Sequence, residues 1–245
     1  MSQVHSGAAA AGEGLPHDFD HTHADVSGGW LRAATFGAMD GLVSNSALIA
    51  GVAASGSVHA VVLSGVAGLL AGAFSMALGE YTSVTTANEQ IESEVRVERR
   101  AFAAHPNAER AELTKMFVDI GLSPETAAQA TTDIHQDENR AINFHLVQEL
   151  GVDPQDKPSP WVAAGSSFVM FALGAVIPLI PYLLGFGVLW FGLACSAVGL
   201  LIAGGAAAHF TRKAVWLGSL RQLTFGAIAI AATYVVGLLI GASVS

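Results

Sequence analysis

The strongest constraint in this 245-residue sequence is the distribution of its charged side chains. Between residues 33 and 79 the only Asp, Glu, Lys or Arg is Asp40, and residues 158–211 and 222–245 contain none. Soluble domains carry about a quarter charged residues, whereas here the share is 13%. Because a membrane-spanning helix needs about 20 consecutive apolar residues, these tracts exclude an ordinary soluble domain and predict an integral membrane protein.

The uncharged tracts divide into five segments of about 20 residues. They predict an all-α membrane protein with five membrane-spanning helices. The expected spans are residues 33–54, 59–80, 161–183, 186–208 and 222–242. The apolar runs lack the alternation of a membrane β-barrel. All eleven Lys and Arg lie before the first span, between the second and third, or between the fourth and fifth. The positive-inside rule then places the N-terminus and the 81–157 insert in the cytoplasm and the C-terminus outside.

We expect four regions along the chain. They are an N-terminal tail at 1–31, the first two spans at 32–80, an acidic cytoplasmic helical domain at 81–157, and the last three spans at 158–245. The tail lacks the apolar segment of a signal peptide, and we expect it to be disordered. It contains His5, His17, His21 and His23. These resemble a metal-attracting tail, although histidine-rich termini without a specific role are also common.

Two further features of composition bear on compartment and chemistry. The single cysteine, Cys195, lies in the fourth span and excludes both a disulfide framework and a thiolate metal site. An Ala- and Gly-rich chain without a targeting segment suggests a bacterial inner membrane.

The insert is expected to contain three helices. Residues 80–105 include neither Gly nor Pro, so the second span should continue into the cytoplasm as one helix. A break at 106–107 precedes a predicted helix over 108–120. Ser123, followed by Pro at the first helical position, marks the start of the next helix, which continues to residue 150 with room for one break.

The insert is strongly acidic, with fourteen acidic and seven basic residues. Several polar side chains have helical spacing and share a face: Glu94 with Glu98, Glu109 with Glu112, and His145 with Glu149. They allow two interpretations. One is a solvated face whose counter-charges are Arg96, Arg99, Arg100 and Arg110. The other is a cluster of carboxylates and an imidazole that binds Fe²⁺, Mn²⁺ or Zn²⁺; spacing alone does not choose between them.

Asp40 is the most informative residue within the spans, because a carboxylate there costs about 2.5–3.5 kcal/mol on insertion scales. It lies on an ion pathway, or else it is protonated or hydrogen-bonded to Ser44. Met76 and Glu80 are four residues apart on the second span. Met76 is of interest only if its thioether meets Asp40, which would give a mixed hard and soft metal site. Glu80 would then be a carboxylate at the cytoplasmic mouth.

The segments TFGAMDGLVSNSALIAG, GLLAGAFSMALGEYTSV, ELG (149–151) and ALGAVIPLIPYLL together resemble the vacuolar iron transporter family, in its bacterial branch. The resemblance covers residues 31–241, nearly everything except the tail. It implies a homodimer with its pore between the first spans, which exports Fe²⁺ and often Mn²⁺ from the cytosol in exchange for protons. It also implies that the cytoplasmic helical domain collects the metal.

The resemblance further implies which residues contact the metal. Within the membrane they are Asp40 and Met76, and in the cytoplasmic domain they are Glu98, Glu109, Glu112 and Glu149. Four positions depart from the family pattern: Ala101 replaces a further glutamate, His145 a methionine, Gly68 a membrane glutamate, and Glu80 a glycine. An imidazole remains a competent ligand. We expect these departures to bear on proton coupling and to shift selectivity toward Mn²⁺.

The expected function is therefore export of Fe²⁺ and also Mn²⁺ by proton antiport. The metal site residues are Asp40, Met76, Glu80, Glu98, Glu109, Glu112, His145 and Glu149. The expected partners are metal ions including Zn²⁺ at the insert, protons, the bilayer and a second copy, with no prosthetic group and no nucleic acid. The alternative is a membrane-anchored metal sensor or storage module without transport. A ferritin-like enzyme is disfavoured because the sequence contains no Glu-x-x-His.

Overall fold

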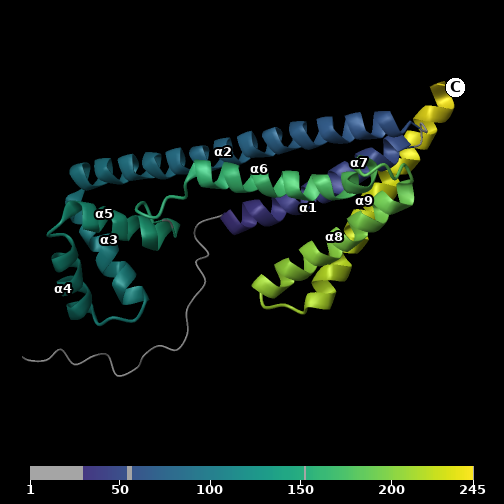
Figure 1. Cartoon of the computed structure of the whole chain (residues 1–245). Coiled ribbons are helices and arrows are strands. Elements are labelled where there is room, and N and C mark those ends of the chain that lie inside the picture. The colour runs from purple at the N-terminus through teal and green to yellow at the C-terminus, as the bar shows by residue number, and fades with distance from the viewer. Residues whose placement is uncertain (1–29, 54–56, 152, 245) are drawn as a thin grey trace, which may run out of the picture.

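The computed structural model describes residues 30–53, 57–151 and 153–244, and every regular element in them is a helix. The order is α1 (Trp30–Ala53), α2 (Val58–Ala104), α3 (Pro106–Asp119), α4 (Pro124–Ile134), α5 (Glu138–Leu150), α6 (Pro160–Val176), the 3₁₀ turn η1 (Ile177–Leu179), α7 (Ile180–Leu183), α8 (Leu189–Phe210) and α9 (Val215–Val244). Figure 1 shows α3–α5 gathered at one end of α2, away from the other helices. The predicted N-terminal tail lies almost entirely outside the described residues.

Five helices in the described part of the chain are long and apolar enough to cross a membrane, which confirms the all-α membrane fold. The first four begin within three residues of the expected spans. The fifth begins at Val215 rather than at residue 222, so that boundary was wrong. Arg221, which the sequence assigns to the preceding loop, lies in the second turn of α9. A long Arg side chain near a helix end reaches the polar interface with its guanidinium, so its charge does not end the helix.

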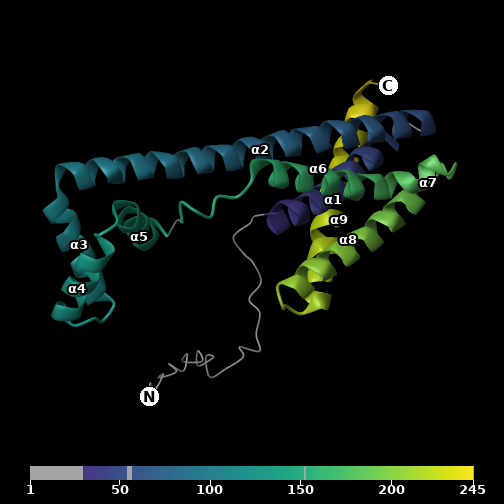
Figure 2. The ribbon, with the colours of Figure 1, turned by 60° about the vertical axis from the view of Figure 1, so that its left-hand side comes forward.

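α2 is a single helix of 47 residues, as the absence of Gly and Pro after residue 80 predicts. At 1.5 Å per residue it extends about 70 Å, more than twice the thickness of a hydrocarbon core. Its first half packs beside α6, and its second half projects from the bundle toward the insert (Figures 1 and 2). The expected division between residues 80 and 81 therefore falls inside a continuous helix.

α1 and α6 approach each other closely because glycines lie at their contact. A Cβ atom at Gly41 would overlap the Phe171 carbonyl, and one at Gly174 would overlap the Ala38 carbonyl. Small residues permit such contact between helices in lipid, where burial of apolar surface does not drive association. This contact fixes the position of Asp40, which lies next to Gly41 on α1.

The third span ends irregularly at its two prolines. α6 stops at Val176, Pro178 lies in η1, and Pro181 lies in α7. Proline lacks the amide hydrogen that continues a helix, which accounts for this interruption. In the last turn of α6, the Ala175 carbonyl accepts a hydrogen bond from Asn45 of α1.

The insert folds around two small apolar cores. One joins α2 to α5 and the other joins α3 to α4; their buried members are Phe102, Ala141, Ile142 and Leu146, and Leu113, Phe117 and Ala127. Ser123 and Asp137 cap α4 and α5 by accepting backbone N–H groups. The predicted 123–150 helix is thus broken once, between Ile134 and Glu138.

The segment that returns from the insert to the membrane is attached to α2. Lys157 Nζ lies 3.0 Å from Glu92 Oε1, and Asn88 Nδ2 donates to the Pro158 carbonyl at 3.0 Å. Figures 1 and 2 show the start of α1, the insert and the α8–α9 turn toward one end of the bundle, with the C-terminus toward the other. The three regions that contain the Lys and Arg residues therefore lie toward the same end.

Candidate metal sites

The first candidate site lies where α2, α3 and α5 meet in the insert. Glu98, Glu109 and His145 each place one ligand atom within 4.8 Å of the others. His145 Nδ1 is 3.2 Å from Glu98 Oε1, 3.7 Å from Glu109 Oε2 and 3.6 Å from Glu149 Oε1. We refer to these four residues as the insert cluster. The fold thus brings together four residues that were predicted to bind metal.

Local structure positions each member of the insert cluster. Phe102, one turn after Glu98 on α2, packs on α5, and its ring centroid lies 5.0 Å from that of His145. Glu109 lies in the first turn of α3, where a carboxylate suits the positive end of the helix. His145 and Glu149 are one turn apart on α5, as their spacing predicts.

Three of the four members of the insert cluster are buried, whereas Glu149 is exposed. Glu98 and Glu109 are 9% and 8% exposed, and His145 is 0% exposed. Among the described residues His145 Nε2 has no hydrogen-bond partner, and His145 Nδ1 and Glu98 Oε1 lie 3.2 Å apart without hydrogen-bond geometry. A buried polar atom left unpaired costs about 1–3 kcal/mol. No ion pair found in the described residues joins an Arg to the cluster, so the counter-charge interpretation does not fit these side chains.

Burial and mutual repulsion alter the proton affinities in the cluster. Burial, followed by the charges of Glu149, Glu109 and Glu112, raises the pKa of Glu98 to about 7. Burial, with a smaller contribution from Glu112, also raises the pKa of Glu149. Burial lowers the pKa of His145, although Glu109 acts in the opposite direction, so the imidazole is neutral near pH 7. A divalent cation would relieve the carboxylate repulsion and accept the imidazole lone pair.

The donor set fits a divalent transition metal. Carboxylate oxygens together with an imidazole nitrogen suit Mn²⁺, Fe²⁺ and Zn²⁺. Two other acids of the insert, Glu112 and Glu94, are not members of the insert cluster. Glu112 is exposed and acts on the cluster through its charge. Glu94, which shares a face with Glu98 in the sequence, is not among the grouped ligands of the described residues.

Sequence reasoning missed His135, which lies beside the cluster. Its ring stacks on Phe102 with centroids 5.4 Å apart and lies 6.0 Å from the His145 ring. His135 Nδ1 is 2.9 Å from the Thr131 carbonyl, which can only accept, so Nδ1 holds the proton and Nε2 is an acceptor. That Nε2 is buried without a partner in the described part of the chain. No periodic signal links His135 to His145, because α4 and α5 are separate helices.

The second candidate site is a pocket of about 230 Å³ between α1, α2 and α6. It is lined by Asp40, Ser44, Asn45, Leu48, Gly68, Gly72, Ser75, Met76 and Phe171, and we refer to it as the membrane pocket. Asp40 and Met76 thus line one space, as a joint metal site requires. The Ser44 hydroxyl donates to the backbone carbonyl of Asp40 and not to its carboxylate. That carboxylate has no hydrogen bond or ion pair within the described residues.

Glu80 lies one turn after Met76 on α2 and is buried. Its Oε2 is 3.1 Å from Nη2 of Arg32, whose side chain is 66% exposed. Glu80 is therefore the inner member of an ion pair, and its predicted place at the cytoplasmic mouth stays a prediction. The sequence holds no signal for this pair, because its members are 48 residues apart on two helices.

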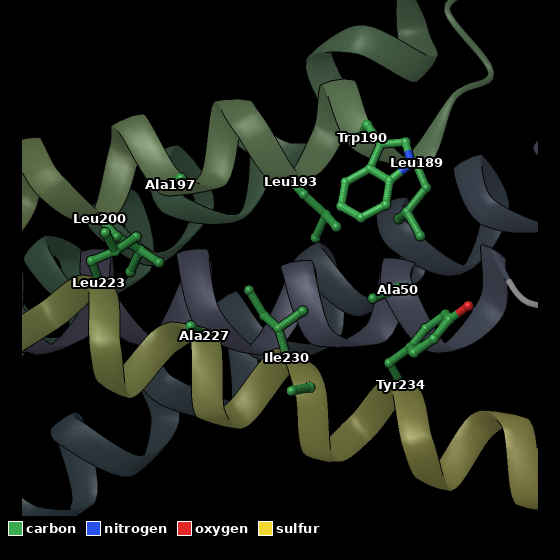
Figure 3. A pocket seen from close by; sticks show the side chains of 11 residues that line it. Ala50, Leu189, Trp190, Leu193, Ala197, Leu200, Leu223, Ala227, Ile230 and Tyr234 are labelled. Atoms are coloured by element: carbon green, nitrogen blue, oxygen red, sulfur yellow. The ribbon is translucent and has the colours of Figure 1, made fainter.

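A larger pocket of about 390 Å³ lies mainly between α8 and α9. Figure 3 shows its lining side chains, among them Trp190 and Leu193 of α8 and Ile230 and Tyr234 of α9. None of its lining residues is an acid, His, Cys or Met. Its chemistry suits apolar groups such as lipid chains, and it is not a cation site.

These features define a helical membrane protein with a carboxylate-rich centre beyond its spans and a single-carboxylate pocket within them. The VIT family matches residues 31–238, and the chain belongs to that family.

Curated relatives resemble the chain over most of its length. The "Vacuolar iron transporter" of Acanthamoeba castellanii is 34% identical over 220 residues, covering 86% of this chain and 78% of the relative. "Vacuolar iron transporter 1" of Arabidopsis thaliana is 29% identical over 222 residues, covering 87% and 88%. "Vacuolar iron transporter homolog 1" of Oryza sativa is 33% identical over 239 residues, covering 95% and 83%. The family and these relatives are transporters, which confirms that the chain is not an enzyme.

Proposed function

We propose that this protein moves Fe²⁺, and also Mn²⁺, out of the cytosol in exchange for protons. One observation carries the proposal: the Asp40 carboxylate, without a partner among the described residues, shares a 230 Å³ pocket with the Met76 thioether between α1, α2 and α6. A carboxylate in a span is costly unless it serves a pathway or a partner. Carboxylate oxygen and thioether sulfur together suit a borderline metal such as Fe²⁺. Relatives named as iron transporters agree with this chemistry.

The insert cluster is proposed to capture the ion before it enters the membrane. Glu98, Glu109, His145 and Glu149 bind it, and the exposed Glu112 adds attraction through its charge. The buried atoms without partners in this cluster support the role, since a cation would supply the missing partner. Zn²⁺ is expected to bind the same ligands.

Proton exchange follows from the chemistry of a carboxylate ligand. A ligand must be deprotonated to bind metal, so a proton and a metal ion compete for Asp40. On the more acidic side of the membrane the proton displaces the ion. We propose that the chain lies in a bacterial inner membrane with the N-terminus and insert in the cytoplasm. The gathering of Lys and Arg toward one end of the bundle supports this orientation.

A homodimer is proposed because the membrane pocket is incomplete in one chain. Ser44 and Ser75 line this pocket yet are exposed within membrane-spanning segments. Polar side chains in a span usually face the bundle interior or a water-filled cavity. A second copy placed against α1 and α2 would cover them and enclose the pocket between the first spans.

The alternative function is a membrane-anchored sensor or storage module. The observation in its favour is that the insert cluster sits between two apolar cores of its own. Proteoliposomes that contain a metal-sensitive dye and a pH-sensitive dye test both functions. Coupled metal and pH signals are expected. A metal signal without a pH signal would contradict proton exchange, and metal binding without any flux would leave the sensor or storage module as the function.

A further inference from the structure

We infer that Asn45 is a further metal-contacting residue of the membrane pocket, and that its side-chain oxygen Oδ1 binds the ion. The inference rests on the proposed function, because it adds a ligand to the ion held by Asp40 and Met76. The observations that carry it concern the orientation, the burial and the surroundings of one amide group.

The orientation of the Asn45 amide is fixed by a hydrogen bond. Nδ2 donates to the Ala175 carbonyl of α6 at 2.6 Å. A carbonyl can only accept, so the nitrogen of the amide must face α6, and Oδ1 must face the other way. The amide therefore cannot rotate to exchange the two atoms without losing this bond.

The oxygen of the same amide has no partner. Asn45 is 2% exposed, and Oδ1 makes no hydrogen bond in the described residues. An unpaired buried acceptor costs about 1–3 kcal/mol in proteins, and the bilayer supplies no water to satisfy it. Asn45 lines the membrane pocket together with Asp40 and Met76, so a cation there would be the missing partner.

Gly68 of α2 keeps space open beside this oxygen. A Cβ atom built on Gly68 would lie 3.2 Å from Asn45 Oδ1 and 2.5 Å from Leu48 Cδ2. The hydrogen bond to Ala175 orients the amide from the α6 side, and the missing side chain at Gly68 leaves room on the α2 side. The oxygen thus faces a space lined by the two residues proposed to hold the ion.

An amide oxygen is a suitable ligand for a transport site, which must bind an ion and then release it. It is a hard, neutral ligand, so it replaces part of the hydration of the ion without adding a second negative charge beside Asp40. Ions are conducted when a site binds strongly enough to admit them and weakly enough to release them. Asn45 would thereby strengthen binding while leaving Asp40 as the only carboxylate that exchanges ion for proton.

Asn88, which lies on α2, supplies a matched control for Asn45 of α1. Its Nδ2 also donates to a carbonyl, that of Pro158 at 3.0 Å, and its Oδ1 is also buried without a partner in the described residues. It does not line the membrane pocket. Replacing either Asn by Leu removes one amide-to-carbonyl hydrogen bond, but only Asn45→Leu removes an oxygen from the pocket.

The test measures uptake of Mn²⁺ and Fe²⁺ by full-length protein in proteoliposomes as a function of metal concentration. Asn45→Leu is expected to raise the KM for both ions about tenfold, while Asn88→Leu leaves it within about twofold. Asn45→Asp retains an oxygen and adds a charge. It is expected to lower the KM and to slow the maximal rate, because the ion is held more tightly. If Asn45 had a purely structural role, Asn45→Asp would not lower the KM and slow the maximal rate at the same time.

Each outcome bears on a distinct claim. If Asp40→Asn abolishes flux but Asn45→Leu has the same KM as Asn88→Leu, the inference is overturned and the proposed function stands. If Asn45→Leu does not fold, Asn45→Asp decides, and an unchanged KM in that variant overturns the inference. Absence of flux in the unmodified protein overturns the proposed function and this inference with it.

Discussion

The two candidate metal sites differ in the number of charges that they place around an ion. The insert cluster arranges three carboxylates about one imidazole, and repulsion and burial raise the pKa of Glu98 to about 7. The membrane pocket offers one carboxylate, one thioether and one amide oxygen. Affinity rises with the charge count of the ligands. This contrast agrees with the proposed function, in which the insert cluster captures an ion and the membrane pocket releases it.

The two sites are also far enough apart to be altered separately. Met76 and Glu98 both lie on α2, and their separation of 22 residues in the sequence corresponds to about 33 Å of helix. Substitutions more than about 10 Å apart without shared partners usually act independently. Variants of one site should therefore leave the property of the other unchanged.

The largest effect is expected from Asp40→Asn. This variant removes the only carboxylate of the membrane pocket, and metal flux should fall at least about 100-fold, since loss of an outer partner of a ligand alone costs about 10–100-fold. Equilibrium binding of Mn²⁺ by the insert cluster, measured by calorimetry, should not change. Ser44→Ala is the control in the same pocket and should retain flux. Undiminished flux in Asp40→Asn would refute the role of this residue.

The second largest effect is expected at the insert cluster, where a substitution should weaken metal binding and leave flux nearly unchanged. Glu98→Gln should weaken Mn²⁺ binding by the insert cluster about 100-fold, because it removes one charge from a buried ligand set. Flux at saturating metal should stay within about threefold, since the membrane pocket is intact. The control is Glu94→Gln, one turn earlier on α2 and outside the grouped ligands. Equal affinities in the two variants would show that Glu98 is not a ligand.

A third effect concerns pH and tests the burial of Glu98. Its pKa of about 7 in the folded protein exceeds the value of about 4.3 in an unfolded chain. Its contribution to stability is therefore complete below about pH 4 and is lost as pH rises through about 7. In metal-free protein, the gain in Tm from Glu98→Gln should grow between pH 5 and pH 8. Added Mn²⁺ should stabilise the unmodified protein at pH 8 and not this variant. A gain in Tm that does not depend on pH would contradict the burial of an ionised Glu98.

The smallest effect is expected from Arg32→Gln. The Arg32 side chain is largely exposed, and ion pairs of this kind contribute about 0.2–1 kcal/mol. Flux should change by less than about fivefold, which corresponds to 1 kcal/mol. Concentration-dependent uptake measures the change, with Arg99→Gln in the insert as the control. A loss as large as that of Asp40→Asn would mean that the Arg32–Glu80 pair belongs to the transport site itself.

The fold was largely predictable because its signals are local. Charge-free tracts reveal spans, and the stretch without Gly or Pro after residue 80 predicts the continuous α2. The one wrong boundary, at the start of α9, arises because a charge suggests the end of a span, whereas Arg221 lies in the second turn of this helix. The members of the insert cluster were found through helical spacing and family resemblance.

The parts of the sites that were not predictable depend on contacts between distant segments. The Arg32–Glu80 pair joins α1 to α2, and the orientation of Asn45 depends on the Ala175 carbonyl 130 residues away. His135 reaches His145 only because α4 ends at Ile134 and the ring of His135, the next residue, stacks on Phe102. Periodicity reports which residues share a face of one helix, and it contains no information on which faces meet.

The unbroken course of α2 has a mechanical consequence. A helix without an internal break behaves as a stiff rod, and this rod carries Met76 at the membrane pocket and Glu98 at the insert cluster. With an arm of about 33 Å between these residues, a tilt of about 5° displaces one end by about 3 Å relative to the other. A displacement of that size nearly equals the 3.2 Å between His145 Nδ1 and Glu98 Oε1. The proposed capture of an ion therefore requires that α2 be held at one angle to α5, and the apolar core formed by Phe102, Ala141, Ile142 and Leu146 joins these two helices.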